Sequence, residues 1–324
     1  MDDAIIDREQ GAFDELLNDE VDTTVDEAEN NIEDIAVSNN NYQIYSGEAL
    51  SCEEIYQVAA KESTKMIVFV GPIGSGKTTI ETTIYQLFHE SPMGELYFAG
   101  SKTILGYEQR AFYTRIKSRG GNPVTPRTVV KMDQSFLHLK LWQKDKDLIN
   151  NFMFADLSGE FFESHIGQVD EVKKNFPFMD RADYFVGVID GELLAERRKM
   201  RSTVSGIIEM IRTFYDAELI NQECVLQVVF SKYDLLSELE NIDQIIAKVK
   251  ESIEGNFEEK FSKIEYFKVA AMPQDTSKFE IGHGLNILLL SWFNKNILEK
   301  YKARKEKFED LSEFDRLEYK FRGI

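Results

Sequence analysis

The sequence contains few of the features that mark secreted or membrane-spanning proteins. Cysteine occurs twice, at Cys52 and Cys224, which is too few for a disulfide framework and is typical of a reducing compartment. The longest apolar runs, such as residues 287–293, are far too short to span a bilayer. The N-terminus is acidic and carries neither the basic nor the apolar segment of a secretory leader. These absences predict a cytoplasmic protein without a membrane partner.

Basic residues are almost absent from the first part of the chain. Residues 1–60 contain 17 Asp and Glu and one basic residue, Arg8, so about −16 of the whole-chain charge of −19 lies there. This negative field disfavours binding to nucleic acid or anionic lipid. The composition is typical of a solvating segment without a fixed structure. Alternatively, the segment forms an acidic helix that docks on a partner or on the chain's own body. Its apolar face would consist of four residues at helical spacing, Phe13, Leu16, Leu17 and Val21.

From residue 65 onward, short apolar segments alternate with segments of helical periodicity. The predicted strands are residues 66–70, 136–142, 151–155, 184–189, 224–230 and 264–269. The predicted helices are residues 78–88, 191–215, 243–261 and 285–305. This alternation predicts an α/β fold, in which a mainly parallel sheet is covered by helices on both faces.

The pattern divides the chain into three parts. Residues 1–60 form the acidic extension, whose last part, residues 42–60, is expected to pack on the core as a strand or a helix. Residues 61–305 form the sheet domain, with a long insert at residues 91–127 and a helix near residues 107–117. Residues 306–324 are predicted to form a helical tail that closes the domain or contacts a partner.

A glycine-rich loop joins the first predicted strand to the first predicted helix. This strand–loop–helix context is the one that the phosphate-loop pattern G-x-x-x-x-G-K-[ST] requires. Its glycines let the backbone curl around phosphates, while successive N–H groups face the anion. Lys77 would reach the β- and γ-phosphates, and the Thr78 hydroxyl would bind Mg²⁺. The residues expected to contact a nucleotide are Gly71, Ile73, Gly74, Ser75, Gly76, Lys77, Thr78 and Thr79.

Two further motifs follow predicted strands, at the sheet edge where open α/β folds bind ligands. In the first, Asp156-Leu157-Ser158-Gly159, Asp156 is expected to hold Mg²⁺ through water and the Gly159 N–H to meet the γ-phosphate. The second is Ser231-Lys232-Tyr233-Asp234. Its terminal carboxylate can accept two N–H bonds from guanine, which adenine does not offer on that edge. The lysine stem can cover the face of the base.

The order and placement of these motifs resemble the translation-factor-like (TRAFAC) class of P-loop GTPases over residues 65–300. The resemblance implies GTP or GDP with Mg²⁺ as ligands and a backbone contact from Ala270 and Ala271 to the base. It also implies a switch threonine that binds Mg²⁺, at either Thr125 or Thr128. The insert with Phe98-Ala99-Gly100-Ser101, together with Gly282-His283-Gly284-Leu285, is similar to the bacterial double-GTPase type of conflict and defence gene clusters.

Several positions depart from small Ras-like GTPases. Besides the long insert, Ser231 replaces the usual Asn or Thr of the base motif, and Glu160 stands where many relatives carry the glutamine that orients water. Glu160 either orients water or acts as a switch residue without a catalytic part. The second role is open because a carboxylate beside the γ-phosphate is unfavourable unless it is protonated or paired. Lys77 and an arginine in cis are expected to stabilise the transition state. The candidate arginines are Arg127 first, then Arg119 and Arg110.

Other polar residues near the motifs have two readings each. Asp190 and Gly191 follow a predicted strand on the ligand edge, where they either contact the ligand or form a turn and a helix start. His165 either meets the nucleotide or lies on the surface. The four histidines show no metal-ligand spacing, so no structural zinc is expected.

The leading hypothesis is a guanine-nucleotide switch that hydrolyses GTP slowly, because the water-orienting glutamine is missing. Its switch regions or its acidic N-terminal segment would bind a protein partner, and its oligomeric state is left open. One alternative is a nucleotide-binding scaffold that does not hydrolyse. Another is an ATP-dependent P-loop enzyme, against which the motif that ends at Asp234 argues.

Overall fold

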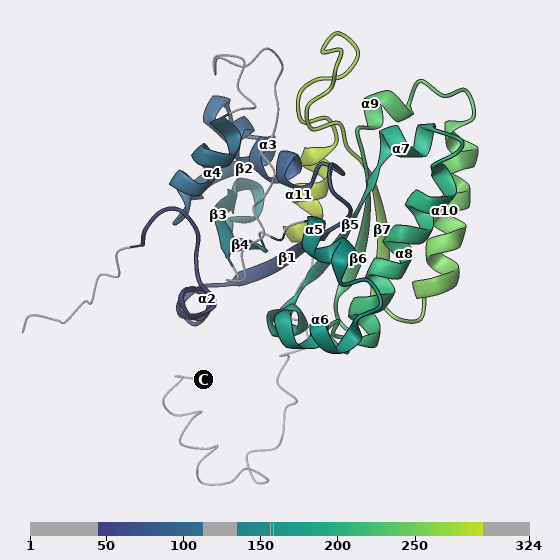
Figure 1. Ribbon diagram of the computed structural model, residues 1–324. Coiled ribbons are helices and arrows are strands. Elements are labelled where there is room, and N and C mark those ends of the chain that lie inside the picture. The colour runs from purple at the N-terminus through teal and green to yellow at the C-terminus, as the bar shows by residue number, and fades with distance from the viewer. Residues whose placement is uncertain (1–44, 113–134, 156, 158, 294–324) are drawn as a thin grey trace, which may run out of the picture. The chain divides into compact units, whose positions relative to one another are not determined.

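The computed structural model describes residues 45–112, 135–155, 157 and 159–293. These residues form a seven-stranded sheet with the strand order β2-β3-β4-β1-β5-β6-β7 (Figure 1). β1, β4, β5, β6 and β7 are parallel, β3 is antiparallel to β4, and β2 is antiparallel to β3. The strands are β1 Thr64–Val70, β2 Leu96–Gly100, β3 Phe136–Gln143, β4 Leu148–Ala155, β5 Tyr184–Asp190, β6 Val225–Ser231 and β7 Lys263–Lys268.

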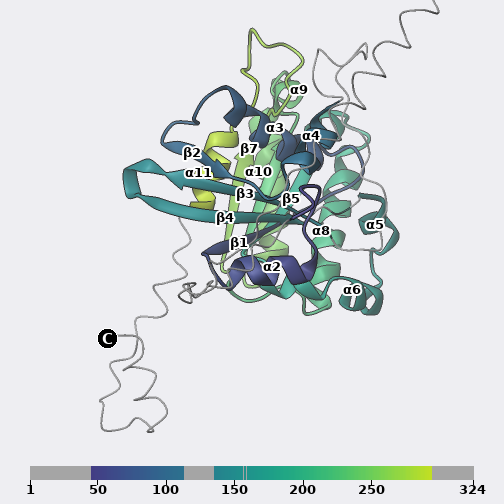
Figure 2. The ribbon, with the colours of Figure 1, turned by 90° about the vertical axis from the view of Figure 1, so that its left-hand side faces the viewer.

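The predicted mainly parallel α/β sheet is confirmed, and six of its strands lie within a few residues of the predicted positions. Their continuous apolar runs reflect burial on both faces, and every residue of β5 and β6 is buried. β2 was not predicted. It lies inside the expected insert and extends the sheet at its antiparallel edge, which faces the viewer in Figure 2. Its side chains are half exposed, so the apolar signal of a buried strand is missing.

Helices cover both faces of this sheet (Figure 1). α3, α4 and α11 contribute to the buried cluster on one face. α2, α6, α8, α9 and α10 contribute to the cluster on the other face. The helices are α2 Cys52–Ala59, α3 Lys77–Glu90, α4 Ile104–Ala111, α5 Gly159–Ser164, α6 Val169–Asn175, α7 Gly191–Ala195, α8 Met200–Asp216, α9 Tyr233–Leu236, α10 Ile242–Phe257 and α11 Leu285–Phe293, with 3-10 turns at Lys144–Lys146 and Pro177–Arg181.

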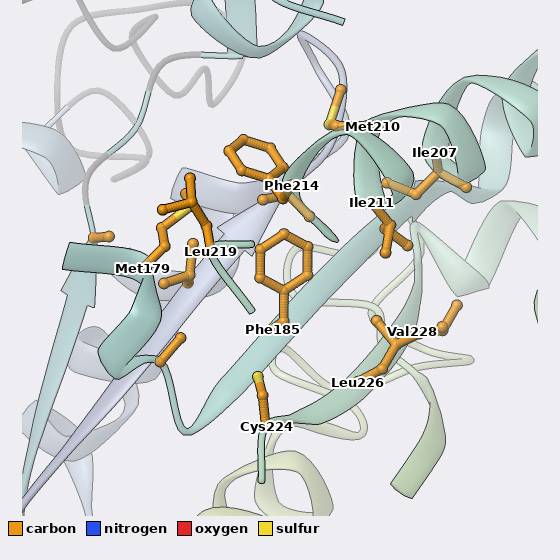
Figure 3. Packing of buried hydrophobic residues seen from close by; sticks show 14 of the residues in the cluster. Met179, Phe185, Ile207, Met210, Ile211, Phe214, Leu219, Cys224, Leu226 and Val228 are labelled. Carbon is orange, nitrogen blue, oxygen red and sulfur yellow. The ribbon is translucent and has the colours of Figure 1, made fainter. Parts of the chain in front are cut away.

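The face covered by α8 shows how the apolar pattern of a helix builds the core. Ile207, Met210, Ile211 and Phe214 repeat at intervals of three and four residues, so they form one buried stripe on α8. Figure 3 shows this stripe against Phe185 of β5, and the Phe185 and Phe214 ring centroids are 5.6 Å apart. The stripe therefore fixes α8 on the central parallel strands.

On the opposite face, α11 anchors the middle of the sheet. Trp292 is fully buried, and its ring lies 6.3 Å from Phe69, 5.9 Å from Phe152 and 5.6 Å from Phe154. Its indole N–H donates to Gln227 Oε1 at 2.8 Å, so the buried polar end of the ring is satisfied. Of the predicted helix 285–305, the structure describes only residues up to 293.

The predicted helix 191–215 is wrong as a single helix, because it is divided into α7 and α8. The Asp190 carboxylate caps α7 by accepting the Glu192 N–H at 2.9 Å, and Glu196 leaves the helical conformation with ψ 105°. α7 packs against α9, whereas α8 packs on β5. The chain bends between these two packing partners. Asp190 and Gly191 therefore form the turn and helix start, which was one of their two expected roles.

Two other helices differ from prediction at their ends. α10 stops at Phe257 rather than at residue 261, because the Ser262 N–H already donates to the Cys224 carbonyl and brings the chain to β7. α4 begins at Ile104, ahead of the predicted residue 107. Within residues 42–60, the described part forms α2, which begins with a Ser51 capping box. The expectations for residues 1–44, 113–134 and 306–324 lie outside the described residues.

A buried histidine joins the antiparallel edge to the rest of the sheet. The His138 Nδ1 accepts the backbone N–H of Lys102 at 2.9 Å, so its Nε2 carries the proton and donates to Asn151 Oδ1 at 2.9 Å. Asn151 donates in turn to Glu62, which also pairs with Lys140. Burial lowers the pKa of His138 to about 4; Lys102 and Lys140 lower it as well, against the opposing effects of Asn151 and Glu62.

Because the pKa of His138 is lowered in the folded protein, we expect the protein to lose stability in mild acid. The imidazole titrates near pH 6.5 in the unfolded chain and near pH 4 in the folded one, so only the unfolded state gains this proton between those values. The free energy of unfolding should therefore fall as the pH drops from 6.5 to 4, by on the order of 3 kcal/mol from this group. Urea denaturation at several pH values measures it.

The matched variant for this experiment is His138→Asn. Its side-chain oxygen can still accept the Lys102 N–H but does not titrate, so the same acid-dependent loss should shrink. A variant that loses stability with the wild-type slope between pH 6.5 and 4 would contradict the assignment to His138.

Candidate nucleotide-binding site

The predicted motifs meet at one edge of the sheet. β1, β4, β5 and β6 are parallel neighbours in the order β4-β1-β5-β6, so their carboxyl ends lie on the same side. The glycine-rich loop follows β1, Gly159 lies just beyond β4, and the base motif begins at Ser231, the last residue of β6. This is the edge at which open α/β sheets bind ligands.

The loop between β1 and α3 has the backbone that a phosphate loop requires. Gly76 has a φ of 95° and Gly74 has a φ of 76°, which is a backbone region that residues other than glycine rarely adopt. At Gly71, a Cβ atom would lie 2.7 Å from the Val188 carbonyl oxygen, so the loop could not pass β5 this closely with any other residue. These glycines allow the tight curl that directs backbone N–H groups inward.

The loop leads into α3, whose N-terminus has no side-chain cap. The N-cap residue is Gly76, so the first N–H groups of α3 receive no side-chain acceptor from it. The Ser75 Oγ is fully buried and has no hydrogen-bond partner in the structure. An uncapped helix start beside a curled loop is suited to an anion, which would accept these N–H groups.

Lys77 supplies a buried positive charge at this position. Its side chain is only 9% exposed, and its ammonium donates to the carbonyls of Gly71 at 2.7 Å and Pro72 at 3.0 Å. Burial lowers the pKa of Lys77 to about 8, although the charges of Glu81 and Glu163 act to raise it. The ammonium is thus held against the loop itself, where a phosphate oxygen would meet it.

The residue that departs from the usual base motif holds the phosphate loop in place. The Ser231 hydroxyl lies 2.7 Å from the Ser75 carbonyl and 3.1 Å from the Ile189 carbonyl, so it bridges β6, β5 and the loop. The hydroxyl is 3.8 Å from the position that a Cβ at Gly76 would take. A short hydroxyl side chain therefore connects the base motif to the phosphate loop.

Lys232 is fixed by two carboxylates next to the base motif. It adopts a left-handed conformation with φ 46°, and its ammonium contacts Asp190 Oδ2 at 2.8 Å and Glu192 Oε2 at 2.9 Å. Burial by itself would lower the pKa of Lys232, but the hydrogen bonds and charges of Asp190 and Glu192 outweigh it and raise the pKa. The lysine stem is consequently oriented by the start of α7.

Asp234 and the loop after β7 form the far end of the site. The Asp234 side chain is 9% exposed, and its Oδ2 accepts the backbone N–H of Gln274 at 2.9 Å. Ala270 and Ala271 begin the same loop, and both are buried. The Ala270 N–H donates to the His283 carbonyl, and the Ala271 carbonyl accepts the Gly282 N–H. These bonds place the loop beside Asp234.

Gly159 brings the second motif against the phosphate loop. A Cβ atom at Gly159 would lie 3.0 Å from both the Ile73 nitrogen and the Lys77 Nζ, so α5 begins in contact with the loop. From the same helix, Glu163 Oε1 accepts the Ile73 N–H at 2.9 Å. Glu160, at the first turn of α5, is exposed.

Two of the remaining candidates, His165 and Arg110, bond to other groups in the described residues, whereas Thr78 and Thr79 directly follow the phosphate loop. His165 bonds to its neighbour Ser164 at 2.9 Å, and Arg110 donates to the Gly106 carbonyl within α4. Thr78 and Thr79 lie half-buried in the first turn of α3. The candidates that fall outside the described residues are Asp156, Thr125, Thr128, Arg119 and Arg127.

Sequence reasoning missed the contacts of three carboxylates of the site: Glu163, Asp190 and Glu192. Glu163 lies four residues beyond Gly159 in α5, a segment for which no helix was predicted. Asp190 was recognised as a helix start, but its ion pair with Lys232 was not. The position of Asp190 at the carboxyl end of a strand next to β6 was the available signal for that pairing.

Among the residues that the structure describes, no three His, Cys, Asp or Glu side chains gather in a way that would hold a metal ion. None of the helices within residues 45–293 that the structure describes is both long and apolar enough to cross a membrane.

A mainly parallel sheet with a phosphate loop between β1 and α3 defines a P-loop nucleotide-binding domain. The model of the Double-GTPase 2 family matches residues 65–293 of this chain. The chain therefore belongs to the Double-GTPase 2 family, and its sheet domain is a GTP-binding domain of a GTPase family. The expected resemblance to double GTPases is confirmed by this match.

Solved structures with a similar arrangement are distant in sequence. One is translation elongation factor SelB from Methanococcus maripaludis in complex with the GTP analogue GppNHp. Its sequence is 14% identical to this chain over the match, which has a TM-score of 0.37 and covers 72% of this chain and 34% of SelB. Another is the signal recognition particle receptor SRβ-GTP/SRX complex from Chaetomium thermophilum. That match has 14% sequence identity and a TM-score of 0.35, and it covers 65% of this chain and 92% of the chain in that structure. The match thus spans about a third of SelB. The curated proteins contain no match to the sequence.

Proposed function

We propose that this protein is a guanine-nucleotide switch that binds GTP with Mg²⁺ and hydrolyses it slowly in the absence of a partner. The observation that carries this proposal is the contact between the two halves of the site. The Ser231 hydroxyl donates to the Ser75 carbonyl at 2.7 Å, so the base motif and the phosphate loop are joined directly.

The described residues suit both ends of the nucleotide. The curled loop, the uncapped start of α3 and the buried Lys77 suit the phosphates. Asp234 is held at its Oδ2 by Gln274, and its carboxylate has further acceptor capacity for guanine N–H groups. Because the Ala270 N–H already donates to His283, we assign the backbone contact with the guanine oxygen to Ala271.

Mg²⁺ would be held by the Thr78 hydroxyl, with Asp156 and either Thr125 or Thr128 as the further candidates. Thr78 lies one residue beyond Lys77 in the first turn of α3, next to the proposed phosphate site, which is consistent with this role. The ion would neutralise phosphate charge. Lys77 would hold the phosphates, and the Gly159 N–H would position the terminal one. These positioning contacts account for most of the catalysis expected of such a site.

Slow hydrolysis follows from the residue after Gly159. Glu160 is exposed and negatively charged where a neutral water-orienting group is expected, so it repels the terminal phosphate. The same observation favours a second candidate, a scaffold that binds GTP without cleaving it. Phosphate release from the purified protein, alone and with candidate partners, separates the two. Fast turnover by the protein alone would contradict both.

Asp234→Ala tests the guanine assignment. The variant removes a charged acceptor from the base site, and we expect the dissociation constant for GTP to rise about 100-fold, on the order of 3 kcal/mol. Titration with a fluorescent GTP analogue, in competition with unlabelled GTP and ATP, measures the change. ATP should compete poorly with the GTP analogue for the wild-type protein. It should compete no worse for the variant.

The matched control is Asp275→Ala in the same loop. The Asp275 carboxylate is exposed and bonds only to its neighbour Ser277 among the described residues, so GTP affinity should stay within about twofold of wild type. Unchanged GTP affinity in Asp234→Ala would refute guanine recognition by this residue. Equal losses in both variants would instead indicate damage to the loop.

We also propose where the switch acts. A protein partner would read the switch regions or the acidic N-terminal segment, and the cytoplasm is the proposed location. The chain contains two cysteines, too few for a disulfide framework, which is consistent with a reducing compartment. Pull-down with the protein loaded with GppNHp or GDP tests the partner proposal, because a switch partner binds one state more strongly.

A further inference from the structure

A carboxylate from α5 occupies a backbone donor of the phosphate loop. Glu163 Oε1 accepts the N–H of Ile73 at 2.9 Å. The residues are 90 positions apart in the sequence, so this bond depends on the docking of α5 against the loop. Glu163 is also close enough to Lys77 for its charge to act on that ammonium. Its carboxylate therefore occupies one backbone donor of the loop and acts through its charge on the ammonium that the site would offer to a phosphate.

The Ile73 N–H lies beside Gly159. Ile73 precedes the helix start by several residues, and a Cβ atom at Gly159 would lie 3.0 Å from its nitrogen. Gly159 is the residue whose N–H is proposed to meet the γ-phosphate. A backbone N–H is a single donor, and it cannot serve Glu163 and a phosphate oxygen well at the same time.

We propose that Glu163 is an internal competitor of the γ-phosphate, and so determines how strongly the site distinguishes GTP from GDP. This inference rests on the proposed guanine-nucleotide function. GDP leaves the Glu163–Ile73 bond in place. The γ-phosphate of GTP displaces the Glu163 carboxylate, because two anions at one donor repel each other, while Gly159 at the start of α5 stays beside the loop. The exposed position of Glu163 allows its side chain to leave.

The consequence is a lower affinity for the triphosphate than the loop alone would give. Part of the binding free energy of GTP is used to displace Glu163, and this coupling links the number of phosphates to the position of the Glu163 side chain. A switch requires such a difference between its two nucleotide states.

The test is the affinity of Glu163→Gln and Glu163→Ala for GppNHp and GDP. Glutamine keeps the length and the acceptor oxygen but removes the charge, whereas alanine removes both. We expect both variants to bind GppNHp about tenfold more tightly and GDP within about twofold of wild type. Fluorescent nucleotide titration measures both.

Glu171→Gln is the matched control, since Glu171 is an exposed carboxylate on the next helix, α6. Its affinities for both nucleotides should equal those of the wild-type protein. If the Glu163 variants bind guanine nucleotides with the wild-type ratio of GppNHp to GDP affinity, the competitor role is wrong and the proposed function stands. If no form of the protein binds guanine nucleotides, the proposed function fails and this inference fails with it.

Discussion

Lys77→Met is expected to raise the dissociation constant for GTP by about two orders of magnitude and that for GDP by about one. The ammonium of Lys77 is the buried positive charge of the phosphate loop, and it bonds to the Gly71 and Pro72 carbonyls. A phosphate brought to this ammonium gains a charge-assisted contact inside a partly desolvated site. Methionine retains the length and apolar stem of lysine without the charge.

The same variant should remain folded. Burial already disfavours the charged form of Lys77, as its lowered pKa shows, so loss of the charge removes a desolvation penalty along with the two carbonyl contacts. Thermal unfolding of the nucleotide-free protein should shift little. Lys248→Met, at an exposed position of α10, is the matched control and should bind both nucleotides as wild type does. If Lys77→Met bound GTP with the affinity of the wild-type protein, Lys77 would not be part of the nucleotide site.

Gly191→Ala is expected to have a large effect on stability, lowering the free energy of unfolding by about 4 kcal/mol. A Cβ atom at Gly191 would lie 2.3 Å from the Ser231 carbonyl oxygen and 3.0 Å from that of Lys232. Both obstacles are backbone atoms, so no side-chain rotation relieves the overlap. Either the start of α7 or the base motif must move. We expect weaker GTP binding in addition to the loss of stability.

The matched control is Gly206→Ala, in the middle of α8, where a new Cβ would meet nothing within 4 Å. Alanine is favoured over glycine in a helix, so this variant should be more stable by about 0.5–1 kcal/mol. Urea denaturation measures both variants, and nucleotide titration shows whether the base site has moved. A Gly191→Ala protein as stable as wild type would show that α7 accommodates the side chain.

Much of the fold was predictable because burial leaves a local signature. β5 and β6 are buried on both faces, so they read as continuous apolar runs. α10 shows the periodicity of a helix with one apolar face. β2 has no comparable signature, because it lies half exposed at the sheet edge. The break between α7 and α8 is also invisible in the sequence, since it follows from their different packing partners.

The candidate site divides in the same way. The phosphate loop and the motif ending at Asp234 were found from sequence, because each needs particular residue types at fixed spacing. The connections between the motifs were not, because Ser231 meets Ser75 across 156 positions and Glu163 meets Ile73 across 90. No local pattern encodes pairings over such distances.

The sequence by itself thus determined the chemistry of this protein: a phosphate loop, a guanine-type base motif and an α/β framework that places both at strand ends. Short-range spacing suffices for these, because backbone conformation and side-chain type act locally. Only the tertiary structure decided that Glu163 contacts the loop and that Asp190 and Glu192 hold Lys232. These ion pairs and hydrogen bonds arise where separate elements pack at the carboxyl edge of the sheet, and packing depends on the whole fold.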